Sequence, residues 1–99
     1  MIDKLRNEQM DILVQGILSL QTPDDCYAFL EDLCTVSELK SMEQRFTVAR
    51  MLLDGMQYTE IVGKTGASTA TISRVNRALM YGADGYEKVI RKLKEEQDL

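Results

Sequence analysis

The chain contains no histidine and two cysteines, Cys26 and Cys34, which stand eight residues apart. Histidine and clustered cysteines are the usual ligands of zinc, and histidine is the commonest general acid or base, so zinc sites and histidine-dependent catalysis have no candidate residues. On one continuous helix the two cysteines would be separated by a rise of about 12 Å, too far for a disulfide. We therefore expect reduced, half-buried thiols, no metal or cofactor and, unless carboxylates act alone, no enzymatic activity.

The chain also has a single proline, six glycines and two phenylalanines, while leucine, methionine and charged residues are abundant. This composition favours helices over a sheet-rich fold. The amino terminus lacks the apolar core of a secretory signal, and no stretch approaches the ~20 apolar residues that span a bilayer. We expect an all-α, cytoplasmic protein without a membrane segment, whose modest core gains stability from a partner subunit.

Acidic residues outnumber basic residues, with a formal net charge of -4, but the two signs are unevenly distributed. Residues 1–35 carry a net charge of -5, residues 36–56 are neutral, and residues 57–94 carry seven basic groups against three acidic ones. A basic carboxyl-terminal part suits a protein that binds nucleic-acid phosphates through that part and associates with a second copy of itself through the other. An ordinary solvated surface is the alternative, and charge alone does not exclude it.

Apolar residues between positions 3 and 20 cover more of a helical surface than one narrow stripe. A helix of this kind requires burial on several sides, which one small chain supplies with difficulty. We interpret the segment as a helix that packs against the second subunit of a homodimer, and the alternative is a central helix in a monomeric bundle. The apolar residues are Leu5, Met10, Ile12, Leu13, Val14, Ile17, Leu18 and Leu20.

Two capping patterns predict helices in the middle of the chain. Thr22 places a hydroxyl N-cap before a proline at the first helical position, which predicts a short helix. Thr35 and Glu38 have the spacing of a capping box and predict a second, longer helix, for which Gly55 offers a stop. We interpret this longer segment as the core helix because its apolar residues recur at spacings of three and four. They are Leu39, Met42, Phe46, Ala49, Leu53 and Met56.

Residues 58–77 have the pattern of a helix-turn-helix. A first short helix places Ile61 and Val62 towards the core, and Gly66 follows as the residue able to adopt a positive φ at a sharp turn. Ser68 is a natural N-cap for a second helix. The inward stripe of that helix, at spacings of three and four, consists of Ile72, Val75 and Leu79.

The opposite face of this second helix is small, hydroxylated and basic. Small residues at the start of a recognition helix let its backbone approach base edges, hydroxyls bond to bases or phosphates, and arginines reach phosphate or guanine. An ordinary helical hairpin with a solvated face is the alternative. We predict DNA binding, with contacts from Lys64, Ser68, Thr69, Ala70, Thr71, Ser73, Arg74 and Arg77.

The segment GASTATISR, residues 66–74, resembles the entry to the recognition helix of the Trp repressor family. Nearly the whole chain is similar to the YerC/YecD-type branch of Trp-repressor-related proteins, with support from residues 44–46, 49–55 and 81–86. The resemblance implies a bacterial transcriptional repressor with a six-helix protomer, intertwined with its twin through the amino-terminal helices. The two helix-turn-helix segments of this dimer would read pseudo-palindromic half-sites about 34 Å apart.

The resemblance also implies an effector pocket. In the tryptophan repressor, tryptophan binds between two arginines, whose positions fall on Arg45 and Arg74, and Thr35 matches a further polar position near that pocket. Where the tryptophan-responsive protein has a glycine, this chain has Val75, whose side chain points to the side where an indole needs room. We expect that tryptophan is not the corepressor, and that the arginines bind a smaller or anionic effector or hold the recognition helix. A solvated Arg45, alone or paired with Glu43, is the alternative.

The absence of repeats, low-complexity tracts and long linkers predicts one domain over residues 1–99. Residues 1–56 supply dimerisation and core helices, residues 57–81 the helix-turn-helix, and residues 82–99 a carboxyl-terminal helix. A different class of protein stays open, namely a helical adaptor that contacts other proteins through its helix-turn-helix, with the acidic first third as partner surface. Duplex DNA binding that weakens steeply with salt would distinguish the regulator from the adaptor.

Overall fold

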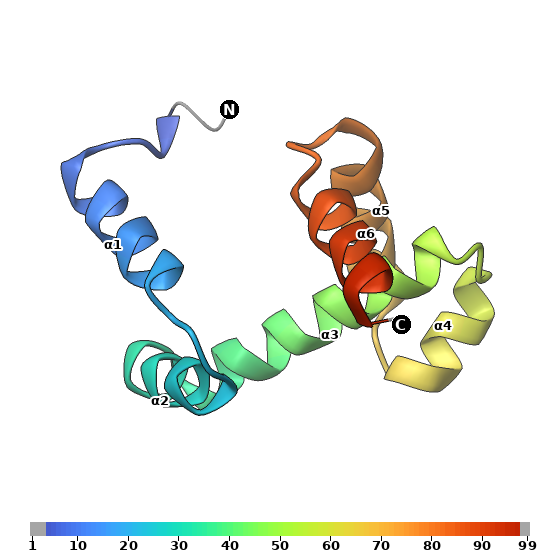
Figure 1. Ribbon diagram of the computed structural model, residues 1–99. Helices are drawn as coiled ribbons and strands as arrows, with labels where there is room; N and C mark the ends of the chain where they lie inside the picture. The colour runs from blue at the N-terminus through green and yellow to red at the C-terminus, as the bar shows by residue number, and fades with distance from the viewer. Residues whose placement is uncertain (1–3, 98–99) are drawn as a thin grey trace. The chain divides into compact units, whose positions relative to one another are not determined.

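The computed structural model describes residues 4–97, which contain six α-helices and no β-strand. The prediction of an all-α protein is therefore confirmed. The chain divides into two compact units, residues 1–39 and 40–99, and the prediction of a single domain stays a prediction. The helices, labelled in Figure 1, are α1 (Glu8–Leu18), α2 (Pro23–Leu33), α3 (Val36–Leu53), α4 (Tyr58–Thr65), α5 (Thr69–Tyr81) and α6 (Gly85–Gln97).

In the first unit, α1 is shorter than the helix predicted over residues 3–20. It begins at Glu8 because the Asn7 side-chain oxygen accepts a hydrogen bond from the backbone N–H of Met10, at 2.8 Å, and caps the helix. It ends at Leu18. The prediction was wrong about both ends of the helix, and residue 3 lies outside the described residues.

Both capping patterns predicted for the next two helices are confirmed. The Thr22 hydroxyl accepts a bond from the N–H of Asp25 at 3.1 Å, with Pro23 in the first turn. The Thr35 hydroxyl accepts from the N–H of Glu38 at 3.0 Å, and the Glu38 carboxylate accepts from the N–H of Thr35 at 2.8 Å. The bond from the Thr35 backbone N–H to the carboxylate, followed by the interaction of the carboxylate with the Thr35 hydroxyl, holds the pKa of Glu38 below its ordinary value of 4.5.

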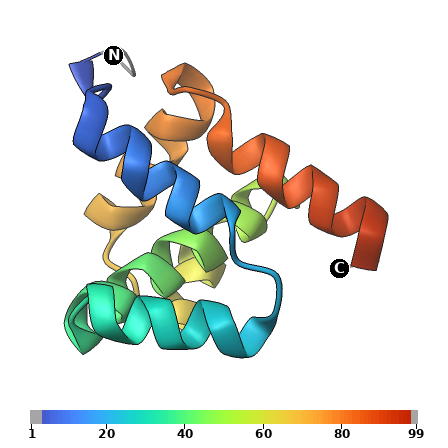
Figure 2. The ribbon, with the colours of Figure 1, turned by 60° about the vertical axis from the view of Figure 1, so that its left-hand side comes forward.

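Neither α1 nor α2, which Figure 2 shows joined by a short extended segment, contains a buried residue. In α1, Ile12 is 59% exposed and Leu18 is 71% exposed. The apolar surface from which a partner helix was predicted is therefore open to solvent in the single chain. Cys26 and Cys34 are free and half-buried, as predicted.

The core of the second unit draws on each of its helices and on the turn between α4 and α5. Figure 1 shows α4, α5 and α6 around the carboxyl-terminal half of α3. The Phe46 and Tyr86 rings, with centroids 6.4 Å apart, pack against this core. Full burial of an apolar side chain such as valine, isoleucine or phenylalanine contributes about 1.5–3 kcal/mol to stability. The core residues, none more than 2% exposed, are Val48, Ala49, Ile61, Ala67, Ile72, Val75 and Ile90.

The apolar stripe predicted along α3 is partly wrong. Val48 lies outside that stripe yet is fully buried, whereas Met42 and Leu53 are 42% and 38% exposed. The reason is that the other helices of the unit pack around the end of α3, and bury residues there from more than one side. Gly55, with φ of +82°, follows the helix as predicted, so Met56 lies beyond it.

The carboxyl-terminal segment begins with a turn, so the helix predicted over residues 82–99 starts at Gly85; residues 98–99 lie outside the described part of the chain. Ile90 is buried, but Val89 is 50% exposed. An ion pair between Lys94 and Asp54, at 2.6 Å, joins α6 to the segment after α3. None of the helices described has the length and apolar composition needed to cross a membrane.

Candidate nucleic-acid interface

Local hydrogen bonds fix the turn between α4 and α5. Gly66 has a φ of +71°, as predicted, and its N–H donates to the Val62 carbonyl at 2.9 Å. The Thr65 hydroxyl donates to the Ile61 carbonyl at 2.7 Å and accepts from the N–H of Ala67 at 3.1 Å. Ala67 is itself buried in the core. The path of the chain from one helix to the next is therefore held on both sides of the glycine.

Ser68 caps α5, as predicted. Its hydroxyl oxygen accepts a bond from the N–H of Thr71 at 3.1 Å, and its O–H donates to the Thr71 hydroxyl at 3.1 Å. Thr71 is half-buried, whereas Ser68 is exposed. These two hydroxyls therefore define the start of α5, and their contact with DNA stays a prediction.

The two faces of α5 differ as the sequence predicted. Ile72 and Val75 are buried in the core, and Leu79 packs against it half-buried. The helix also packs against α4, which completes the helix-turn-helix pair. The exposed residues of α5 are Thr69, Ala70, Ser73, Arg74 and Arg77, with Met80 and Tyr81 at its carboxyl end.

The basic side chains of this face are not neutralised by neighbours. Within residues 4–97, neither Arg74 nor Arg77 has an ion-pair partner. Lys64, at the end of α4, lies 3.8 Å from Glu60, but both side chains are 54% exposed. An exposed pair of this kind contributes about 0–1 kcal/mol, so Lys64 can leave it for another anion at little cost.

The residues predicted for an effector pocket lie in different settings. Thr35 belongs to the first unit, where its hydroxyl is used in the capping box. In the second unit, Arg45 is half-buried on α3, Arg74 is exposed on α5, and Val75 is 1% exposed. Val75 thus points towards the core, as predicted, while the pocket itself stays a prediction.

Two hollows in the second unit were not predicted from the sequence. An apolar groove of 490 Å³ is lined by Phe46, Ala78, Ala83, Gly85, Tyr86 and Val89. Its only sequence signal is the run of small residues after α5, which faces two aromatic rings in space. A hollow of 390 Å³ beside α6 is lined by Asp84, Glu87, Lys88, Arg91, Lys92 and Glu95.

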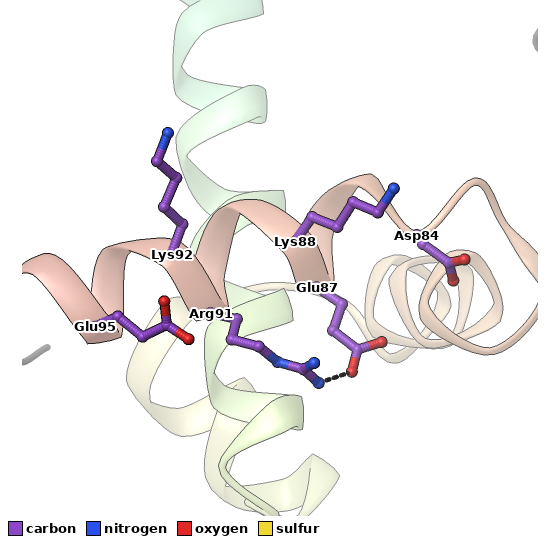
Figure 3. A pocket seen from close by; sticks show the side chains of 6 residues that line it. All are labelled: Asp84, Glu87, Lys88, Arg91, Lys92 and Glu95. Atoms are coloured by element: carbon purple, nitrogen blue, oxygen red, sulfur yellow. Dashed lines mark hydrogen bonds and ion pairs between the residues drawn. The ribbon is translucent and has the colours of Figure 1, made fainter.

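The hollow beside α6 has mixed charge. Figure 3 shows Arg91 bonded to Glu87, with Lys88 and Lys92 directed to the other side of the helix. Three acidic and three basic groups line it, whereas phosphate binding requires a predominance of basic ones. The exposed face of α5 is therefore the better candidate for contact with nucleic acid.

A tight turn with Gly66 in the left-handed conformation joins α4 to α5, and α5 has one buried face and one exposed face. These features define a helix-turn-helix protein. The family model described as Trp repressor protein matches residues 8–94 of the chain. The uncharacterized protein YerC of Bacillus subtilis (strain 168) is 53% identical over 94 residues, which cover 95% of this chain and 90% of that protein. The chain therefore belongs to the Trp repressor family, a family of DNA-binding transcription regulators.

Solved structures agree with this assignment. A candidate Trp repressor from Staphylococcus aureus is 45% identical, with a TM-score of 0.90, covering 94% of this chain and 93% of that chain. A TrpR-like protein from Eubacterium eligens ATCC 27750 is 53% identical, with a TM-score of 0.89, covering 92% of this chain and 94% of that chain. The predicted Trp-repressor-like fold of YerC type is confirmed.

Proposed function

We propose that the chain is a sequence-specific, double-stranded DNA-binding transcriptional repressor that reads a pseudo-palindromic operator as a homodimer. The observation that carries the proposal is the two-sided character of α5. Its inner residues Ile72 and Val75 anchor it in the core, while its outer face is exposed and basic. A rigid helix with one free face of this kind fits the major groove.

Four residues of the outer face, together with Lys64 of α4, have assigned roles in the proposed complex. Thr69 and Ala70, in the first turn of α5, are small enough to let the backbone approach base edges. Ser73 lies one turn further on, where its hydroxyl can bond to a base or a phosphate. Arg77 reaches phosphate or guanine, and Lys64 contacts the backbone from the end of α4.

The proposed homodimer is supported by α1 and by the distribution of charge. Apolar side chains on several sides of α1 are exposed in the single chain, and a second copy would bury them. The acidic residues 1–35, with a net charge of -5, are suited to contact with protein rather than phosphate. Two-fold symmetry would place the two recognition helices on half-sites about one turn of DNA, ~34 Å, apart.

Duplex binding across a series of salt concentrations tests the proposal, with a random duplex pool as ligand and the mass of the complex as a second readout. The logarithm of the affinity should fall linearly with the logarithm of salt, by about 0.9 per phosphate neutralised. Each complex should contain two chains. Absence of duplex binding at low salt would contradict the proposal and support the adaptor instead.

A further inference from the structure

Gln44, on α3, binds the helix-turn-helix from outside it. Its side-chain N–H donates to the Thr65 carbonyl at 3.2 Å, in a partly buried position. Thr65 is the last residue of α4, and the last four carbonyls of a helix have no partner within the helix. The bond from Gln44 thus satisfies a carbonyl immediately before the turn.

The place of Gln44 on α3 explains why it reaches this carbonyl. It lies four residues before Val48, so the two side chains share one face of the helix. Val48 is fully buried in the core that includes Ile61 of α4 and Ile72 of α5. The face of α3 that carries Gln44 is therefore the face that packs against the helix-turn-helix.

From this geometry we infer that Gln44 is a positioning residue for α5, an inference that rests on the proposed function. Its bond holds the end of α4, and the turn that follows is bonded at Thr65, Gly66 and Ala67. A displacement of the Thr65 carbonyl is therefore passed to Thr69, four residues later. Recognition of bases requires side chains held to within about 0.5 Å, so a small change in direction lowers affinity.

The surroundings of the bond separate this positioning role from a role in stability. The bond lies beside a polar hollow of 350 Å³. Water in this hollow can bond to the Thr65 carbonyl when the glutamine is removed, so the carbonyl is not left unpaired. The fold should therefore survive the change, while the Thr65 carbonyl and the turn that follows it are displaced relative to α3. The hollow is lined by Lys40, Glu43, Gln44, Thr47, Lys64 and Thr65.

The variant Gln44→Met tests the inference, because methionine has a similar shape but no N–H donor. Three quantities are measured in the full chain: duplex affinity, Tm, and the carbonyl ¹³C resonance of Thr65 by NMR. We expect the resonance to shift, the affinity to fall by about tenfold or more, and Tm to fall by no more than about 8 °C. Gln97→Met makes the same chemical change at an exposed site at the end of α6 and should leave all three unchanged.

Each other result has a definite meaning. Wild-type affinity in Gln44→Met, with or without a shifted resonance, would overturn the inference, and so would an unshifted resonance. If the methionine variant does not fold, Gln44→Asn replaces it, since its amide is one methylene too short to reach the carbonyl. If the wild-type chain binds no duplex, the proposed function fails, which is a different result from equal binding by both proteins.

Discussion

Val75 is the residue that bears most directly on whether tryptophan acts as an effector. Its side chain is 1% exposed and belongs to the core of the second unit, a cluster that also includes residues of α3, α4 and α6. A β-branched side chain at this position fills space on the inner side of α5. We propose that Arg45 and Arg74 either bind a smaller or anionic effector or hold α5 in position.

We predict that the chain does not bind tryptophan, because Val75 fills the space that an indole would need. Isothermal titration of the wild-type protein with L-tryptophan should give no saturable heat at millimolar ligand. A tryptophan-responsive repressor, titrated under the same conditions, serves as the positive control. Saturable binding in the micromolar range would refute this prediction.

At the same scale, the capping residues were predictable and the tertiary hydrogen bonds were not. Thr22, Thr35 and Ser68 act on amides three residues away, so their spacing in the sequence identifies them. The bond from Gln44 to Thr65 joins residues 21 apart, and its geometry depends on how α3 packs. No local pattern could have indicated Gln44, although it bears on the candidate site.

At the scale of the elements, replacing two different glycines by alanine should change the stability of the fold in opposite directions. A Cβ at Gly82, which ends α5, would lie 2.3 Å from the Ala78 carbonyl oxygen, whereas a Cβ at Gly63, inside α4, would meet nothing within 4 Å. Gly82→Ala should therefore destabilise the fold by about 1–3 kcal/mol, because backbone must move. Gly63→Ala should stabilise it by about 0.5–1 kcal/mol, because alanine loses less conformational entropy in a helix.

Urea unfolding of both variants and the wild type measures these free energies. Each variant serves as the matched control for the other, since both replace a glycine by alanine and add one methyl group. A Gly82→Ala protein as stable as the wild type would show that the chain relaxes after α5 without cost. In that case Gly82 would not be required at the end of α5.

Element types were predicted better than element boundaries. The 3.6-residue period identifies α5 and its buried side because one set of neighbours covers one face. In α3 the same method missed Val48, since several helices pack around its end and no single stripe describes the burial. In α1 the apolar run extends past the helix in both directions, and Asn7 rather than the pattern sets its start.

At the scale of the whole molecule, the charge division and the family assignment support the same function. The family assignment accounts for the six helices, and the exposed face of α5 carries two of the seven basic residues in the carboxyl-terminal part, Arg74 and Arg77. The buried and exposed faces of α5 could be predicted because they follow from the spacing of apolar residues in the sequence alone. The second subunit predicted to cover α1 stays a prediction, because the single chain shows only that the apolar side chains of α1 are exposed.

The central claim is that the outer face of α5 binds duplex DNA, and the salt dependence of binding by Arg77→Ala tests it most directly. Arg91→Ala, with the same change of charge on the exposed side of α6, is the matched control. Arg77→Ala should weaken binding by about tenfold or more, with an unchanged Tm. It should also lower the slope of log affinity against log salt by about one for each bound chain. Arg91→Ala should keep the wild-type slope. Equal affinities and slopes for wild type and Arg77→Ala would contradict the account.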